Sequence, residues 1–122
     1  MLVRIGLLLI FVLAIWGLIF GYRIYNTKRI FRSTVSDMDK TFKTEIPIGT
    51  DLTVAINKLN GIRCEDTSYI KRTYTVTKKN EVVYATLVVA SNMTENTCSF
   101  VFAFDNAMKL NTYSYKSYYL GL

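Results

Sequence analysis

The stretch EVVYATLVVASNMTENTCSFVFAFD, residues 81–105, decides the fold. It contains two runs rich in Val, Thr, Tyr and Phe, residues 81–91 and 97–105, separated by a short polar joint. Runs of this composition are typical of β-strands, and a joint of this length suits a hairpin. The stretch therefore predicts two consecutive antiparallel strands.

Two further runs of the same kind flank this pair, at residues 68–78 and 110–120, and short polar joints lead into them. Consecutive runs with short joints favour hairpins, so we expect a four-stranded antiparallel meander. Alternation along each strand gathers apolar side chains on one face of the sheet. On that face we expect Ile70, Tyr74 and Val76 from the first run and Phe100, Phe102 and Phe104 from the third.

Upstream of the sheet the apolar period changes from 2 to 3.6, which predicts helices that cover the apolar face. A short helix begins after Thr50 or Asp51, either of which can cap it, and ends at Gly61. A longer amphipathic helix over residues 31–45 ends before Pro47, because proline cannot continue a helix. The short helix is apolar at Leu52, Ala55, Ile56 and Leu59, and the long one at Phe31, Val35, Met38 and Phe42. The fold class is therefore α+β, with one or two helices packed on the meander in two layers.

Residues 5–22 carry no charged or strongly polar side chain. As a helix they would be about 27 Å long, close to the thickness of the hydrocarbon core of a bilayer. The run is longer than the apolar part of most signal peptides, and no small-x-small cleavage site precedes Arg23, so we expect an uncleaved signal anchor rather than a cleaved signal peptide. The chain then divides into an anchor with a basic flank (1–30), an amphipathic helical linker (31–45) and an α+β domain (46–122).

Two observations disagree about the orientation of the anchor. Bases are retained on the cytoplasmic side, and Arg4 and the free amino group precede the apolar run whereas four bases follow it. These membrane-flanking bases are Arg23, Lys28, Arg29 and Arg32. Against this, a disulfide between Cys64 and Cys98 would stabilise the domain by about 3–4 kcal/mol and would require an oxidising compartment. The alternative is two unrelated buried thiols. We expect the disulfide, and hence a single-pass protein whose C-terminal domain is exported.

Composition argues against several kinds of chemistry. The 122 residues include no histidine and two cysteines, which removes histidine-based relays and most metal sites. The net charge is +6, but residues 1–32 hold five bases and no acid, so most of the charge flanks the apolar run instead of forming a nucleic-acid-binding face. Glu65 and Asp66 lack a catalytic partner and are expected to be solvated. We expect no enzyme activity, no catalytic residues, no metal or other cofactor, and no nucleic-acid partner.

The last run is rich in tyrosine. Tyr113, Tyr115 and Tyr119 share one face of it, and Tyr118 lies on the other. Tyrosine is enriched in recognition surfaces because it buries a large area and keeps a hydrogen-bonding hydroxyl. The alternative is that these rings pack across the sheet or against the helix. We predict that the three rings contact a partner protein, and that the run, if it is an edge strand, could accept a strand of that partner.

The order of helix, Pro-Ile-Gly-Thr turn (residues 47–50), short helix and strand meander resembles the BamE/SmpA-type envelope proteins, and the β-lactamase inhibitor protein has a related fold. The similarity lies in TDLTVAINKL (50–59), in FVFAFDNAMKL (100–110), where a strand ends in a Phe-Asp turn, and in YLGL (119–122). This chain carries an anchor where those lipoproteins carry an acylated cysteine. The resemblance implies a small envelope domain that binds proteins and performs no catalysis.

Two classes of function fit these observations. We expect a membrane-anchored, non-catalytic protein-binding module on the outer face of a bacterial inner membrane, in contact with membrane lipid and with one other protein. It would be an immunity or inhibitor protein against a toxin, or an accessory subunit of an envelope complex. The alternative is a structural subunit of a secretion or pilus-like machine that assembles through its transmembrane helix, where Gly17 and Gly21 form a small-xxx-small spacing.

Overall fold

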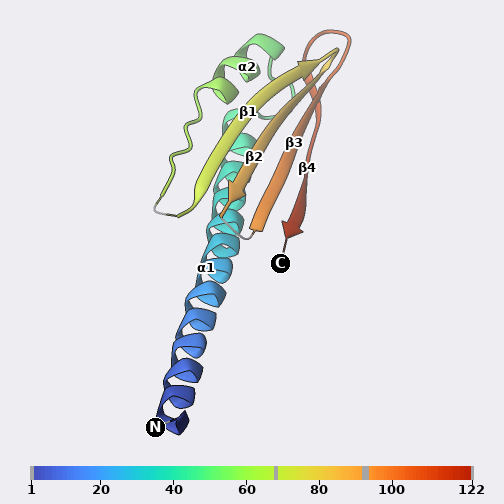
Figure 1. Ribbon diagram of the computed structural model, residues 1–122. Coiled ribbons are helices and arrows are strands. Elements are labelled where there is room, and N and C mark those ends of the chain that lie inside the picture. Colours follow the sequence, from blue (N-terminus) through green and yellow to red (C-terminus); the bar gives the residue numbers. More distant parts are fainter. Residues whose placement is uncertain (1, 68, 92–93, 122) are drawn as a thin grey trace.

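The described residues form the predicted α+β fold with a four-stranded sheet (Figure 1). The helix count differs slightly from the prediction, because the expected anchor and amphipathic helix are one continuous helix and a second, short helix follows it. The computed structural model describes residues 2–67, 69–91 and 94–121, without the side chains of residues 120 and 121. Its elements are α1 (Leu2–Glu45), α2 (Leu52–Asn60), β1 (Lys71–Lys79), β2 (Val82–Ala90), β3 (Thr94–Phe104) and β4 (Leu110–Gly121).

The strands form an antiparallel meander in the order β1-β2-β3-β4, so the predicted topology is confirmed and β1 and β4 are the two edges. Asn80, at φ 57°, makes the tight turn from β1 to β2. In the turn from β3 to β4, the Asp105 carboxylate accepts hydrogen bonds from the backbone N–H groups of Ala107 (2.9 Å) and Lys109 (3.0 Å). Local polar side chains of this kind are what a short hairpin turn requires.

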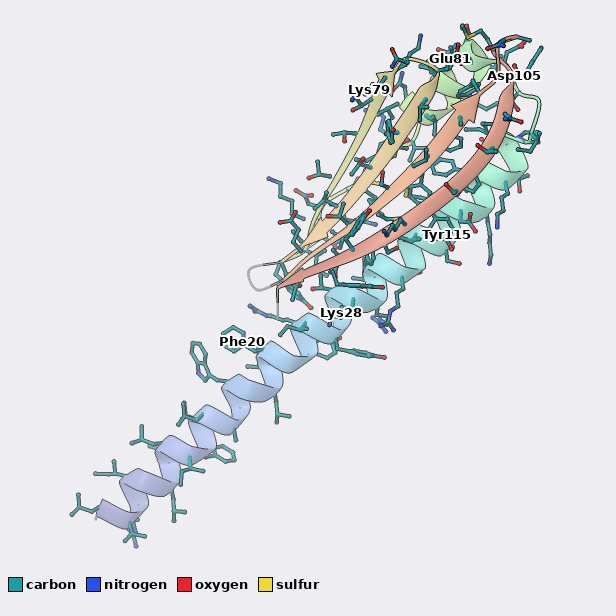
Figure 2. All side chains as sticks on the ribbon, turned by 90° about the vertical axis from the view of Figure 1, so that its right-hand side faces the viewer. Phe20, Lys28, Lys79, Glu81, Asp105 and Tyr115 are labelled. Carbon is teal, nitrogen blue, oxygen red and sulfur yellow. The ribbon has the colours of Figure 1, made fainter. Side chains whose placement is uncertain are left out.

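The C-terminal half of α1 lies along one face of the sheet (Figures 1 and 2). Its predicted apolar stripe is buried, and comprises Phe31, Val35, Met38 and Phe42. The Phe42 ring meets Phe100 and Phe102 edge-on, with ring centroids 4.9 and 5.3 Å apart. The segment 31–45, expected as a linker, therefore supplies a large part of the core that the domain buries.

The N-terminal half of α1 projects away from the domain (Figure 2). Its large apolar side chains are 37–86% exposed from Leu2 to Phe20. α1 contains an 18-residue window that is apolar enough to cross a membrane, and none of this window is buried within the protein. A single N-terminal apolar helix of this kind is compatible with a single-pass membrane protein.

α2 packs over the β1 side of the sheet, and its predicted apolar face is buried at Ala55 and Leu59. The predicted side-chain cap is wrong. Asp51 occupies the N-cap position without capping the helix, because its carboxylate instead pairs with the ammonium of Lys109 at the start of β4. Gly61 follows the helix with φ −78°, so the end of α2 does not use the freedom of glycine.

The turn between the helices fixes the start of β4. Gly49, at φ +95°, donates its backbone N–H to the Leu110 carbonyl at 2.9 Å, and Leu110 donates to the Thr50 carbonyl at 2.8 Å. A φ in this region is easily adopted only by glycine. The first residue of β4 is thereby tied to the end of α1, which sets the strand alongside the helix.

The expected disulfide is wrong, because Cys64 and Cys98 are both free thiols. Cys98 lies on β3 and is fully buried, whereas Cys64 lies in the loop leading to β1, beside Arg72. Burial raises the pKa of both thiols. The argument for export that rested on a disulfide is therefore lost.

Candidate partner-binding edge

A hollow of about 250 Å³ lies between α1 and β4, at one edge of the sheet. Figure 2 shows Tyr115 of β4 beside α1 in this region. The helix contributes side chains about one turn apart along one flank, and the strand contributes alternate side chains. We call this feature the α1–β4 hollow, and its lining residues are Phe31, Arg32, Val35, Ser36, Asp39, Tyr115, Ser117 and Tyr119.

Two of the three predicted tyrosines present their rings at this hollow. Tyr115 is 46% exposed and Tyr119 is 52% exposed. Each ring also rests on a buried phenylalanine: Tyr115 lies 5.6 Å from Phe100, and Tyr119 meets Phe31 edge-on at 5.7 Å, both measured between ring centroids. The rings are thus half exposed and held by the core, which is how a preorganised contact residue is built.

The third predicted tyrosine, Tyr113, serves a different role. It is half-buried, its ring lies 5.0 Å from the Phe102 ring, and its hydroxyl donates a 2.8 Å hydrogen bond to Asp39. Burial and the hydrogen bond to Asp39 raise the pKa of its phenol. The structure makes Tyr113 a packing residue that joins β4 to α1, while Tyr118 lies on the opposite face with Lys116 over its ring at 5.3 Å.

Asp39 is the charged residue of this region that sequence reasoning missed. Its carboxylate accepts from Tyr113 and forms an ion pair with Lys43 at 3.1 Å, and the side chain is only 15% exposed. The spacing held a signal, because Asp39 lies four residues after Val35 and three before Phe42, and so borders the apolar stripe. The Tyr113–Asp39 bond closes the end of the α1–β4 hollow that is distant from the anchor.

The backbone of β4 also has free groups along the outer edge of the sheet, beside the hollow. The backbone N–H of Phe104 donates to the carbonyl of Glu81, just before β2. Because the backbone groups of successive residues point to opposite sides of a strand, even-numbered residues of β3 bond to β2 and odd-numbered residues bond to β4. The β3–β4 register pairs Val101 with Ser114 and Ser99 with Lys116. The free N–H and C=O groups of β4 therefore belong to its odd-numbered residues, which are Tyr113, Tyr115, Ser117 and Tyr119.

At the opposite edge, β1, the chain caps the first outward backbone N–H and places bases along the strand. The Arg72 N–H, which the same alternation directs outward, donates to the Asp66 carboxylate at 2.9 Å, and the Arg72 guanidinium donates to the Glu65 carbonyl at 2.6 Å. Four bases stand along this strand, a pattern that discourages pairing with another strand. They are Lys71, Arg72, Lys78 and Lys79. The Asp66 carboxylate and the Glu65 backbone carbonyl thus hold Arg72 at the start of this edge.

The basic flank after the apolar run is partly engaged by the domain. The Arg23 guanidinium lies 4.9 Å from the centroid of the Tyr69 ring, and the Tyr69 hydroxyl accepts from the Asn26 amide at 3.0 Å. Arg29 bonds to the same Asn26 side chain at 2.7 Å. These contacts hold the domain at the point where α1 leaves its apolar half.

Among the residues that the structure describes, no three His, Cys, Asp or Glu side chains gather in a way that could hold a metal ion. The chain matches no protein-family model, no curated protein and no solved structure. The resemblance to BamE/SmpA-type envelope proteins stays a prediction from the sequence.

Proposed function

We propose that this chain is a membrane-anchored, non-catalytic protein-binding module that contacts its partner at the α1–β4 hollow. The observation that carries the proposal is the pair Tyr115 and Tyr119, both about half exposed and both supported from beneath by buried phenylalanines. Aromatic rings held in place by a core lose little conformational entropy on binding, and such residues dominate the energetics of many interfaces.

The resemblance to small envelope domains supports a finer proposal. In this proposal the module stands at the outer face of a bacterial inner membrane, as an immunity or inhibitor protein or as an accessory subunit of an envelope complex. The bases after the apolar run favour the opposite side under the positive-inside rule. A reporter fused after the C-terminus decides this point, because activity of a periplasmic reporter supports the outer face and activity of a cytoplasmic reporter contradicts it. The binding proposal holds on either side.

Co-precipitation from detergent extracts of cells that make the tagged full chain tests the binding proposal. We expect a partner to be retained by the native chain and by Thr75→Ala on β1, an exposed position distant from the hollow. Tyr119→Ala or Tyr115→Ala should weaken retention by roughly 5- to 150-fold, the range that a contact worth about 1–3 kcal/mol implies. Equal retention by all four chains would contradict the proposal.

An exchange of the anchor separates this proposal from assembly through the membrane helix. A chain whose residues 5–22 are replaced by an unrelated transmembrane helix should keep its partner, because the hollow is built entirely from residues 31–119. Loss of the partner from this chain, with retention by Tyr119→Ala, would favour the structural-subunit alternative.

A further inference from the structure

We propose that the β4 edge receives an extended segment of a second membrane protein, which pairs with β4 as an added antiparallel strand running away from the bilayer. This inference rests on the proposed function, since it specifies the partner and its mode of binding at the same edge. It follows from the state of the two sheet edges, from the direction of β4 and from the position of the anchor.

The state of the edges favours strand addition at β4. Over Leu110–Gly121 the strand has one charged residue, Lys116, and no proline or described bulge after its first residues. No described hydrogen bond from within the chain reaches the outward backbone groups of Tyr115, Ser117 or Tyr119. A long edge without guarding charges is a template for another strand, whereas the chain guards β1 with four bases and an acidic cap.

The anchor excludes pairing of β4 with β4 of a second copy in the same membrane. β4 lies alongside the upper half of α1 and runs back towards the anchor (Figures 1 and 2). Antiparallel pairing of two identical edges requires a two-fold axis perpendicular to the strand. That axis also reverses α1, so the two anchors would point in opposite directions. The occupant is therefore a different chain.

The position of β4 indicates where that chain comes from. Tyr119, near the end of β4, packs on Phe31, which lies nine residues, or about 14 Å of helix, beyond Tyr22 at the end of the apolar run. About four extended residues span this distance. A protein anchored in the same membrane can thus reach β4 with a short linker, and its confinement to the membrane raises its effective concentration at the edge.

The hollow also specifies the chemistry of the added segment. The inward side chains of the added segment, at every second position, would meet the exposed rings of Tyr115 and Tyr119, so we expect them to be apolar or aromatic. Arg32 is exposed at the same hollow, and an acidic side chain of the segment would complement it. The segment is therefore an alternating apolar–polar stretch of about eight residues close to a transmembrane helix.

Photo-crosslinking of the full chain in cells of its source tests this inference. A benzophenone amino acid replaces Tyr118 near the anchor end of β4, Thr112 near its far end, or Thr75 on β1 as the control; all three positions are exposed. We expect adducts from both β4 positions to one membrane protein and none from β1. Residue numbers run in opposite directions along two antiparallel strands. The crosslink from Thr112 should therefore lie about six partner residues C-terminal to the crosslink from Tyr118.

A matched pair of proline substitutions tests the backbone pairing. Ser117→Pro removes an outward N–H from β4, and Lys78→Pro removes one from β1, and both lie on edges where proline is tolerated. The adduct should fall at least tenfold with Ser117→Pro and stay within twofold with Lys78→Pro. The order of crosslinked partner residues needs no proline variant, so it remains decisive if Ser117→Pro does not fold.

Three outcomes would overturn the inference. If Ser117→Pro is folded and keeps the adduct while Tyr119→Ala loses it, the proposed function survives and strand addition fails. An adduct with a soluble protein, or with a second copy of the chain, contradicts the class of partner inferred here. Absence of adducts from both β4 positions, together with no partner in the co-precipitation, contradicts both proposals.

Discussion

The two edges of this sheet differ in the charge along them, since β1 carries four bases and β4 one. At β1 the loop before the strand folds back, and its Asp66 caps the Arg72 N–H. At β4 the neighbouring element is α1, which leaves a hollow beside the strand instead of covering it. Charges along an edge strand discourage pairing with another strand, and β4 has fewer of them than β1. This difference is the basis of our proposal that a partner binds at β4.

The largest expected effect concerns the packing that holds β4 in place. Phe42→Ala removes the ring that meets Phe100, Phe102 and Tyr113, and should lower the free energy of unfolding by about 3–5 kcal/mol. Denaturant unfolding of the full chain in detergent measures this loss. Hydrogen exchange should show that β4 loses protection before β1. Equal loss at both edges would remove the claim that Phe42 specifically supports the β4 side.

A smaller effect concerns the hydroxyl that joins β4 to α1. Tyr113→Phe deletes the bond to Asp39 and should cost about 1 kcal/mol at pH 7. Because folding raises the pKa of Tyr113, its contribution is complete below the unfolded pKa of about 10 and is lost as the pH rises above that value. Thermal unfolding of both chains at pH 7 to 11 should show the native advantage disappearing above pH 10. An advantage unchanged at pH 11 would contradict this account.

Opening the protected edge should have a similar or smaller effect on stability. Asp66→Ala leaves the Arg72 N–H without its cap and should cost about 0.5–1 kcal/mol, since the site is exposed to water. With Lys78→Thr and Lys79→Thr added, the β1 edge should begin to pair between copies in detergent, which sedimentation would detect. A monomeric triple variant would mean that these residues do not protect the edge.

The smallest expected effect is that of a reducing agent on stability, which should be zero. A Cys64–Cys98 disulfide would tie the loop at the β1 edge to the centre of the sheet, and would add about 3–4 kcal/mol. With both thiols free, a reducing agent should leave the unfolding free energy unchanged, and two thiols should titrate in the protein unfolded without reduction. One bond and no free thiols would reinstate the disulfide and the case for an oxidising compartment.

Much of this fold could be predicted from the sequence because its periodicities are strong. The stripe Phe31, Val35, Met38 and Phe42 and the alternation around Phe100 each follow one period without interruption, so local pattern and tertiary packing agree. The strand bounds differ by up to three residues, because Thr94 and Asn96 are polar yet buried at the start of β3. A pattern based on apolar residues assigns such positions to the joint.

The candidate site was only partly predictable. Composition drew attention to the tyrosines, but a ring on a sheet face can pack inward or meet solvent, and only the position of α1 distinguishes Tyr113 from Tyr115 and Tyr119. The disulfide failed for a similar reason, since the number and spacing of two cysteines in a sequence do not tell whether the fold brings them together. Asp39 was missed because its partner lies 74 residues away in the chain.

Amide hydrogen exchange of the full chain tests the central claim most directly. Exchange is compared between native membranes and the purified protein in detergent, for the segments 111–119 of β4 and 71–79 of β1. We predict that the odd-numbered amides of β4 exchange rapidly in the purified protein and become protected in membranes, while β1 exchanges equally in both. Protection gained at β1, or no difference at β4, would contradict the assignment of β4 as the binding edge.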